Sequence, residues 1–124
     1  MRDYKNIKAY QFADDLVMEI YGITKSFPKE ELYGVTSQIR RAAVSVCANI
    51  TEGASRKHKK DYLRFLFIAR GSLAETEYLL QLGFKLEYLG PEQFKRIDEL
   101  RQKTAKTLFG LIRSVEEEVR QNRN

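Results

Sequence analysis

The segment RRAAVSVCANITEGASRKHKKDYLR, residues 40–64, contains the end of one predicted helix, a turn and the start of the next. Residues 42–51 carry no formal charge and repeat apolar side chains at helical spacing. Gly53 suits the C-terminal cap of this helix, and Ser55 suits the N-terminal cap of the helix that follows. A short connection between long helices makes them antiparallel neighbours, so the segment predicts a helical hairpin.

Apolar stripes of the same period predict four helices in all, at about residues 4–25, 35–52, 57–88 and 91–120. The Val-rich middle of the second also resembles a strand, but its length and its polar start favour a helix. Pro28 and Gly34 interrupt the chain after the first helix, and Pro91 suits the first turn of the fourth. We therefore predict an all-α, antiparallel up-and-down four-helix bundle that forms one domain, residues 1–124.

Composition narrows the class of protein. The chain is 43% hydrophobic and 31% charged, which is typical of an ordered globular domain and not of a disordered tail. Its single cysteine, Cys47, cannot form an internal disulfide. No apolar run approaches the roughly 20 residues that cross a bilayer, and the first ten residues do not resemble a secretion signal. We expect a soluble cytoplasmic protein that does not bind membranes.

The sequence gives little support for an enzymatic function. His58 is the only histidine and has no Glu three residues before it, so the Glu-x-x-His pairs of di-iron bundles and the usual zinc patterns are missing. Cys47 lies within an apolar helix, which favours a packed cysteine over a reactive thiolate. Neither a GxxxxGK[ST] nor a GxGxxG phosphate loop occurs. We expect no catalytic residue, metal or cofactor.

Positive charge is concentrated in residues 36–70, where eight Lys and Arg face two acids, a net +6 against +5 for the whole chain. RKHKK, residues 56–60, falls where the third helix starts, a position that disfavours cations but suits phosphate binding. The alternative is a solvated face that only aids solubility. Tyr62 is the best candidate for stacking a base. The candidate nucleic-acid-binding residues are Arg40, Arg41, Arg56, Lys57, Lys59, Lys60 and Arg64.

The second and third helices carry more apolar surface than one bundle core needs. FLFIA, residues 65–69, points apolar side chains in every direction around a helix. A second copy of the chain is the simplest cover for the outward side chains. The alternative to an oligomer is that the third helix is central and loops cover its outward side. The candidate interface residues are Val44, Cys47, Phe65 and Phe67.

Two segments carry a family resemblance: SQIRRAAVSVCANITEG, residues 37–53, and YLRFLFIARGSLAETEYLL, residues 62–80. They resemble the bacterial four-helix bundle family that includes proteins encoded in intervening sequences of 23S ribosomal RNA genes. The family often has Pro where this chain has Cys47. The residues at the family spacing are Arg40, Arg41, Asn49, Glu52, Gly53, Gly71, Ser72, Leu73 and Glu75.

The resemblance implies a homopentamer, because the family is similar in fold to the accessory protein of diversity-generating retroelements. That protein is a basic pentameric barrel that binds nucleic acid and a reverse transcriptase. No activity is implied for individual residues. Our first hypothesis is a non-enzymatic homo-oligomer, a pentamer, whose basic surface binds RNA or DNA. The second is a protein-interaction adaptor that docks an acidic partner and has no nucleic-acid role.

Overall fold

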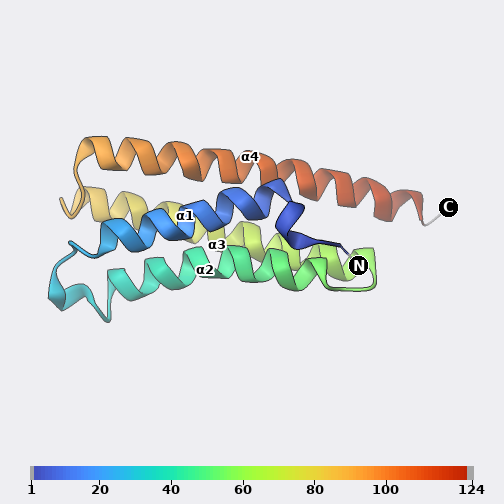
Figure 1. The fold of residues 1–124 in the computed structure, drawn as a ribbon, viewed down its shortest axis with the longest axis horizontal. Coiled ribbons are helices and arrows are strands. Elements are labelled where there is room, and N and C mark those ends of the chain that lie inside the picture. The colour runs from blue at the N-terminus through green and yellow to red at the C-terminus, as the bar shows by residue number, and fades with distance from the viewer. Residues whose placement is uncertain (1, 123–124) are drawn as a thin grey trace.

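The computed structural model describes residues 2–122 and contains, within them, four long α-helices in up-and-down order (Figure 1). They are α1 (Lys8–Thr24), α2 (Val35–Ala54), α3 (Lys59–Lys85) and α4 (Pro91–Gln121). Single 3₁₀ turns, Tyr4–Asn6 and Lys29–Glu31, precede α1 and α2. α1 packs against α2 and α4, and α3 packs against the same two helices, with α2 and α3 in the most extensive contact. The predicted all-α four-helix bundle is confirmed.

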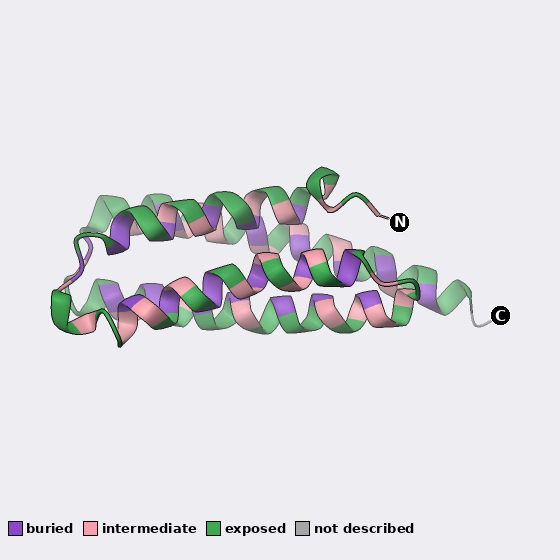
Figure 2. Cartoon of the chain, turned by 60° about the horizontal axis from the view of Figure 1, so that its bottom comes forward, coloured by how far each residue is buried: buried purple, intermediate pink, exposed green. Residues whose placement is uncertain are grey.

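One apolar core runs the length of the bundle. Buried positions recur along each helix at helical spacing, with exposed positions between them (Figure 2). Three of the buried threonines donate their hydroxyls to the carbonyl four residues earlier: Thr24, Thr76 and Thr104. These bonds satisfy polar groups that would otherwise cost stability inside an apolar core. The largest fully buried apolar side chains are Leu16, Ile20, Ile39, Val46, Ile50, Leu66, Leu80, Ile97 and Leu108.

The first and third helices are shorter than predicted. The Asp3 side chain accepts the Lys5 amide at 3.1 Å and closes a 3₁₀ turn, and Ile7 is extended at φ −80° and ψ 120°, so α1 begins only at Lys8. α3 ends at Lys85 because Glu87 adopts φ 64°, a left-handed conformation. The Tyr88 amide then donates to the Gly83 carbonyl at 2.9 Å, as in a Schellman cap.

Neither cap predicted at the α2–α3 turn is present. α2 continues past Gly53 to Ala54, and a Cβ at position 53 would lie 2.9 Å from the Phe65 Cβ, so this glycine allows close helix packing. The Ser55 hydroxyl donates to the Glu52 carbonyl at 2.7 Å and so extends the end of α2. His58 occupies the N-cap position of α3 without a side-chain hydrogen bond. Ser55 therefore does not cap α3.

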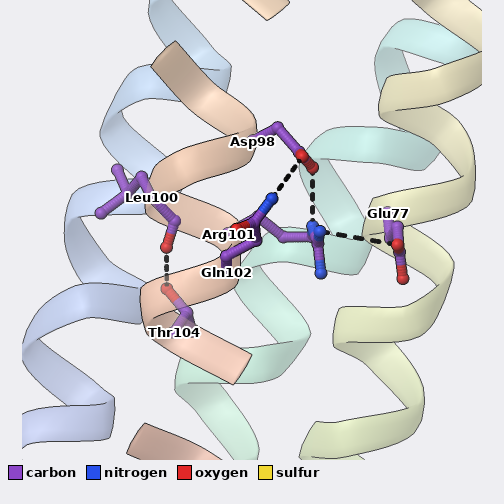
Figure 3. Close-up of polar contacts among 6 residues, drawn as sticks. All are labelled: Glu77, Asp98, Leu100, Arg101, Gln102 and Thr104. Carbon is purple, nitrogen blue, oxygen red and sulfur yellow. Dashed lines mark hydrogen bonds and ion pairs between the residues drawn. The ribbon is translucent and has the colours of Figure 1, made fainter. Parts of the chain in front are cut away.

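A charged cluster joins α3 to α4 (Figure 3). The Arg101 guanidinium, mostly buried, contacts Asp98 at 2.9 Å and Glu77 of α3 at 3.5 Å. Burial of Asp98 raises the pKa of its carboxyl. Hydrogen bonds from Arg101 and Gln102, together with the Arg101 charge, outweigh that effect and hold the pKa below its usual value. The Arg101–Glu77 pair thus connects the two helices.

Glu31 accepts two hydrogen bonds at the end of the bundle opposite the α2–α3 turn. Its Oε1 accepts the Val35 amide at 3.3 Å at the start of α2, and its Oε2 accepts the Tyr88 hydroxyl at 2.7 Å. This carboxylate satisfies an amide of the α2 N-terminus, where Gly34 in the N-cap position has no side chain to do so. None of the helices within residues 2–122 combines the length and the apolarity needed to span a bilayer.

Candidate nucleic-acid interface

Five of the seven predicted phosphate-binding residues lie together at one end of the bundle. The α2–α3 turn, residues 55–58, is at the same end as the N-terminal segment and the last turns of α4 (Figure 1). We call this turn and the first two turns of α3, residues 55–64, the basic turn. Its cations are Arg56, Lys57, Lys59, Lys60 and Arg64.

Arg40 and Arg41 lie elsewhere. Residue 40 is about 21 Å along α2 from Ala54, at 1.5 Å per residue. The Arg40 Nε donates to the Thr24 hydroxyl at 2.8 Å, and its guanidinium lies 4.7 Å from the Tyr21 ring centroid, so Arg40 holds α1 against α2. Arg41 is exposed on the outer side of α2. The structure therefore does not bring either residue into the basic turn.

Three of the five cations have acidic neighbours. Glu52 lies 2.7 Å from Arg56, Glu118 of α4 lies 3.8 Å from Lys59, and Asp61 lies 3.8 Å from Arg64. All three pairs are partly exposed, and such pairs contribute only about 0–1 kcal/mol, so they are readily exchanged for another anion.

The remaining two cations, Lys57 and Lys60, are exposed. Among residues 2–122 neither has an acidic oxygen within the 4.0 Å that defines an ion pair. Lys57 and Lys60 are therefore the cations of the basic turn that have their charge available for a ligand.

Arg2 joins this end of the molecule, although the sequence pattern did not indicate it. Its Nη1 donates to the Arg56 carbonyl at 2.7 Å, and its guanidinium lies 4.3 Å from the centroid of the Tyr62 ring. Arg2 then lines a surface hollow with Ser55, Arg56 and Lys57. The contact joins positions 54 residues apart, which no local pattern reveals.

Tyr62 does not offer a surface for a base. Its side chain is buried, facing the core with Leu66 and covered by Arg2. Burial raises the pKa of its hydroxyl, although the Arg2 charge opposes the shift. Tyr62, the better candidate for base stacking by sequence, is therefore not placed to stack a base. Tyr62 belongs to the apolar stripe of α3, and this pattern could have predicted that its side chain is buried.

The outer face of α2 and α3 retains exposed apolar side chains. Val44 is 41% exposed, Phe67 36% and Ile68 43%, so the loops do not cover the back of α3. Phe65 and Cys47, the other predicted interface residues, are half-buried. Sequence reasoning did not single out Ile68. Phe67 and Ile68 of α3 line one shallow hollow, and we call the surface formed by these two side chains the outer apolar face.

Cys47 packs against the core, and burial raises the pKa of its thiol to about 12. The thiol is therefore protonated at neutral pH, and the nucleophilic thiolate is not formed there. Within residues 2–122 no group of three or more His, Cys, Asp or Glu side chains is placed to hold a metal ion.

Beside the outer apolar face lies a polar hollow between α2 and α3. The hydroxyls of Ser45 and Ser72 are hydrogen-bonded at 2.8 Å, and the Asn49 amide donates to Ser45 Oγ at 3.0 Å. Arg41 and Glu75 line the same hollow. Three residues at the family spacing thus make contacts between helices: Arg40, Gly53 and Ser72.

Fold and surface together define a small helical-bundle protein with a basic turn at one end and an apolar outer face on its central hairpin. A family model described as 23S rRNA-intervening sequence protein matches residues 5–110, and the chain belongs to this family. A crystal structure of a protein of unknown function from the S23 ribosomal protein family of Bacteroides thetaiotaomicron is similar, with a TM-score of 0.78. It is 27% identical, and the match covers 85% of this chain and 95% of the other. No curated protein matches significantly. The family resemblance inferred from residues 37–53 and 62–80 is confirmed.

Proposed function

We propose that this protein is a non-enzymatic homo-oligomer, a pentamer, that binds the phosphate backbone of RNA or DNA at the basic turn. The observation that carries the proposal is the exposed pair Lys57 and Lys60, which has no acidic partner within residues 2–122. Two neighbouring guanidinium groups, from Arg56 and Arg64, add positive charge to the same surface. Phosphates attract such a surface without reading sequence.

The oligomer part of the proposal is supported by the outer apolar face and by unmatched charges beside it. Arg41 and Glu75 line one hollow, yet neither forms an ion pair within the described residues. A head-to-tail contact between copies would place apolar side chains together and offer each charge a partner on the next copy. Such contacts close into a ring when the rotation between copies allows it. The number five comes from the resemblance to the pentameric accessory protein.

The family description supports a nucleic-acid role only indirectly, because an intervening sequence in a 23S rRNA gene is a gene location. The charge pattern is the stronger support. An acidic protein partner would use the same cations, so the experiment must separate the two. A pull-down from nuclease-treated lysate does this, because a protein partner survives nuclease treatment and a nucleic acid does not.

The decisive experiment compares two double variants of equal charge change. Lys57→Gln/Lys60→Gln alters the basic turn, and Lys103→Gln/Lys106→Gln alters exposed lysines of α4 as a matched control. With a 20-bp duplex in 50 mM salt, we expect the first to weaken binding about tenfold or more. We also expect it to lower the slope of log K against log salt by about 2, because each lost phosphate contact lowers the slope by about 1.

The control should bind within about twofold of the wild type. Equal losses in both variants would show that the basic turn is not the site. A wild-type protein that binds no duplex at 50 mM salt would overturn the nucleic-acid function itself.

A further inference from the structure

Phe65 is held between two arginines of the basic turn. The Arg56 guanidinium carbon lies 4.7 Å from the ring centroid, and that of Arg64 lies 4.6 Å from it. Both distances are within the range of a cation–π contact. The ring is therefore in contact with the protein's own cations, and it restricts where those cations can point.

The two neighbouring aromatic rings are covered in the same way. Arg2 lies 4.3 Å from the Tyr62 centroid, and Arg70 lies 4.9 Å from that of Phe67. Tyr62 is buried besides, and Phe67 belongs to the outer apolar face. We call Tyr62, Phe65 and Phe67 the arginine-covered rings.

Proteins that prefer single-stranded nucleic acid usually stack bases on open aromatic faces beside a basic groove. Here a guanidinium already lies over each ring, so a base that stacked on a covered face would cost at least one cation–π interaction. The arginines, by contrast, have N–H groups left for phosphate oxygens, because a stacked guanidinium still donates from its edge.

We propose that nucleic acid at the basic turn is held through phosphates alone, so that the preferred substrate is a duplex with its bases left in their own stack. This rests on the proposed function and specifies its substrate class. Duplex DNA carries one charge per about 1.7 Å of axis from its two strands, whereas each strand alone carries one per about 3.4 Å. A surface that contacts only phosphates therefore binds a duplex at least as tightly as a single strand.

The test uses a 20-nucleotide RNA with a central 2-aminopurine, alone and annealed to its complement, at low salt. We expect duplex affinity equal to or above that of the single strand, and unchanged 2-aminopurine emission when the single strand binds. Single-strand preference above about tenfold, with an emission change, would overturn the proposal and leave the proposed function intact. Binding of neither probe would overturn both.

Variants of the ring sharpen the test. Phe65→Leu removes the support of Arg56 and Arg64. We expect it to weaken duplex and single-strand binding by the same factor, about two- to fivefold, the equivalent of one exposed cation–π contact. Phe109→Leu is the matched control, because Phe109 is an exposed ring on α4 with Arg113 5.8 Å from its centroid. A loss confined to the single strand would mean that Phe65 stacks bases.

Arg64→Lys keeps the charge and uncovers part of the ring, and its exposed position makes it safe for folding. Phosphate-only binding predicts an unchanged ratio of duplex to single-strand affinity in this variant. Base stacking predicts that the single strand binds more tightly once the ring is open, which would overturn the proposal even if Phe65→Leu fails to fold.

Discussion

The Tyr88 hydroxyl donates a 2.7 Å hydrogen bond to Glu31 Oε2 and so joins the α3–α4 connection to the turn before α2. The bond also explains why the pKa of Tyr88 is raised, since the neutral hydroxyl donates to a carboxylate. We expect Tyr88→Phe to lower the free energy of unfolding, because a charge-assisted hydrogen bond between the α3–α4 connection and the turn before α2 is lost. Urea unfolding measures this.

Tyr78→Phe is the control for that variant, because Tyr78 is 61% exposed and its hydroxyl makes no hydrogen bond within the described residues. Its stability should match the wild type within about 0.3 kcal/mol, the ordinary range of surface substitutions. Equal losses in both variants would show that the Tyr88–Glu31 bond contributes nothing.

Gly53 should not tolerate a methyl group. A Cβ there would lie 2.9 Å from the Phe65 Cβ and 3.2 Å from the Tyr62 carbonyl oxygen, so α2 and α3 would have to separate. We expect Gly53→Ala to cost about 1–3 kcal/mol despite the better helix propensity of alanine. Gly110→Ala on α4, which meets no atom within 4 Å, should instead stabilise the protein by about 1 kcal/mol. Thermal unfolding distinguishes the two signs, and a stabilising Gly53→Ala would contradict the close packing.

A charge in the outer apolar face should separate the copies of the proposed oligomer. Ile68→Glu places a carboxylate beside Phe67, and burying it at an interface without a partner costs several kcal/mol. Light scattering should then give the mass of one protomer, against a multiple of it for the wild type. Met18→Glu, at an exposed apolar position on α1, should leave the wild-type mass unchanged. A wild-type mass of one protomer would overturn the oligomer.

Asp98 should stabilise the fold in a pH-dependent way. Its pKa is lower in the folded chain than its usual 3.8, so its contribution is present above that value and is lost as pH falls through the lower, folded value. We expect Asp98→Asn to cost about 0.5–1 kcal/mol at pH 7 and progressively less as pH falls below 4. Urea unfolding across pH 3–7 checks this. Asp15→Asn, an exposed change on α1 that also removes one carboxylate, serves as the control and should stay within about 0.5 kcal/mol of the wild type at pH 7.

The fold was predictable because apolar residues recur at helical spacing in all four segments and the connections are short. The cap predicted at Gly53 failed for an instructive reason. A glycine near the end of an apolar stripe serves either a left-handed cap or a close helix contact, and one sequence cannot separate these uses. The structure shows the second use, since Gly53 is helical and lies against Phe65.

The sequence predicted the positive charge of the candidate site but not the acidic partners of its cations. Residues 56–64 reveal the five cations, but the Glu118 that pairs with Lys59 comes from a helix about 60 residues later. Arg2 likewise reaches the turn from the other end of the chain. Tyr62 fitted two patterns at once, an aromatic beside cations and a member of an apolar stripe, and burial favoured the stripe. Only tertiary contacts could decide these cases.

The short turn between α2 and α3 also affects the order in which the protein folds. Ser45–Ser72 and Gly53–Phe65 are contacts within a single hairpin, so they close small loops at little entropic cost and should be among the first to form. A chain that emerges from the ribosome N-terminus first exposes this hairpin before α4. Until α4 packs against the hairpin, Glu118 is absent from the basic turn and the charge of Lys59 is not compensated.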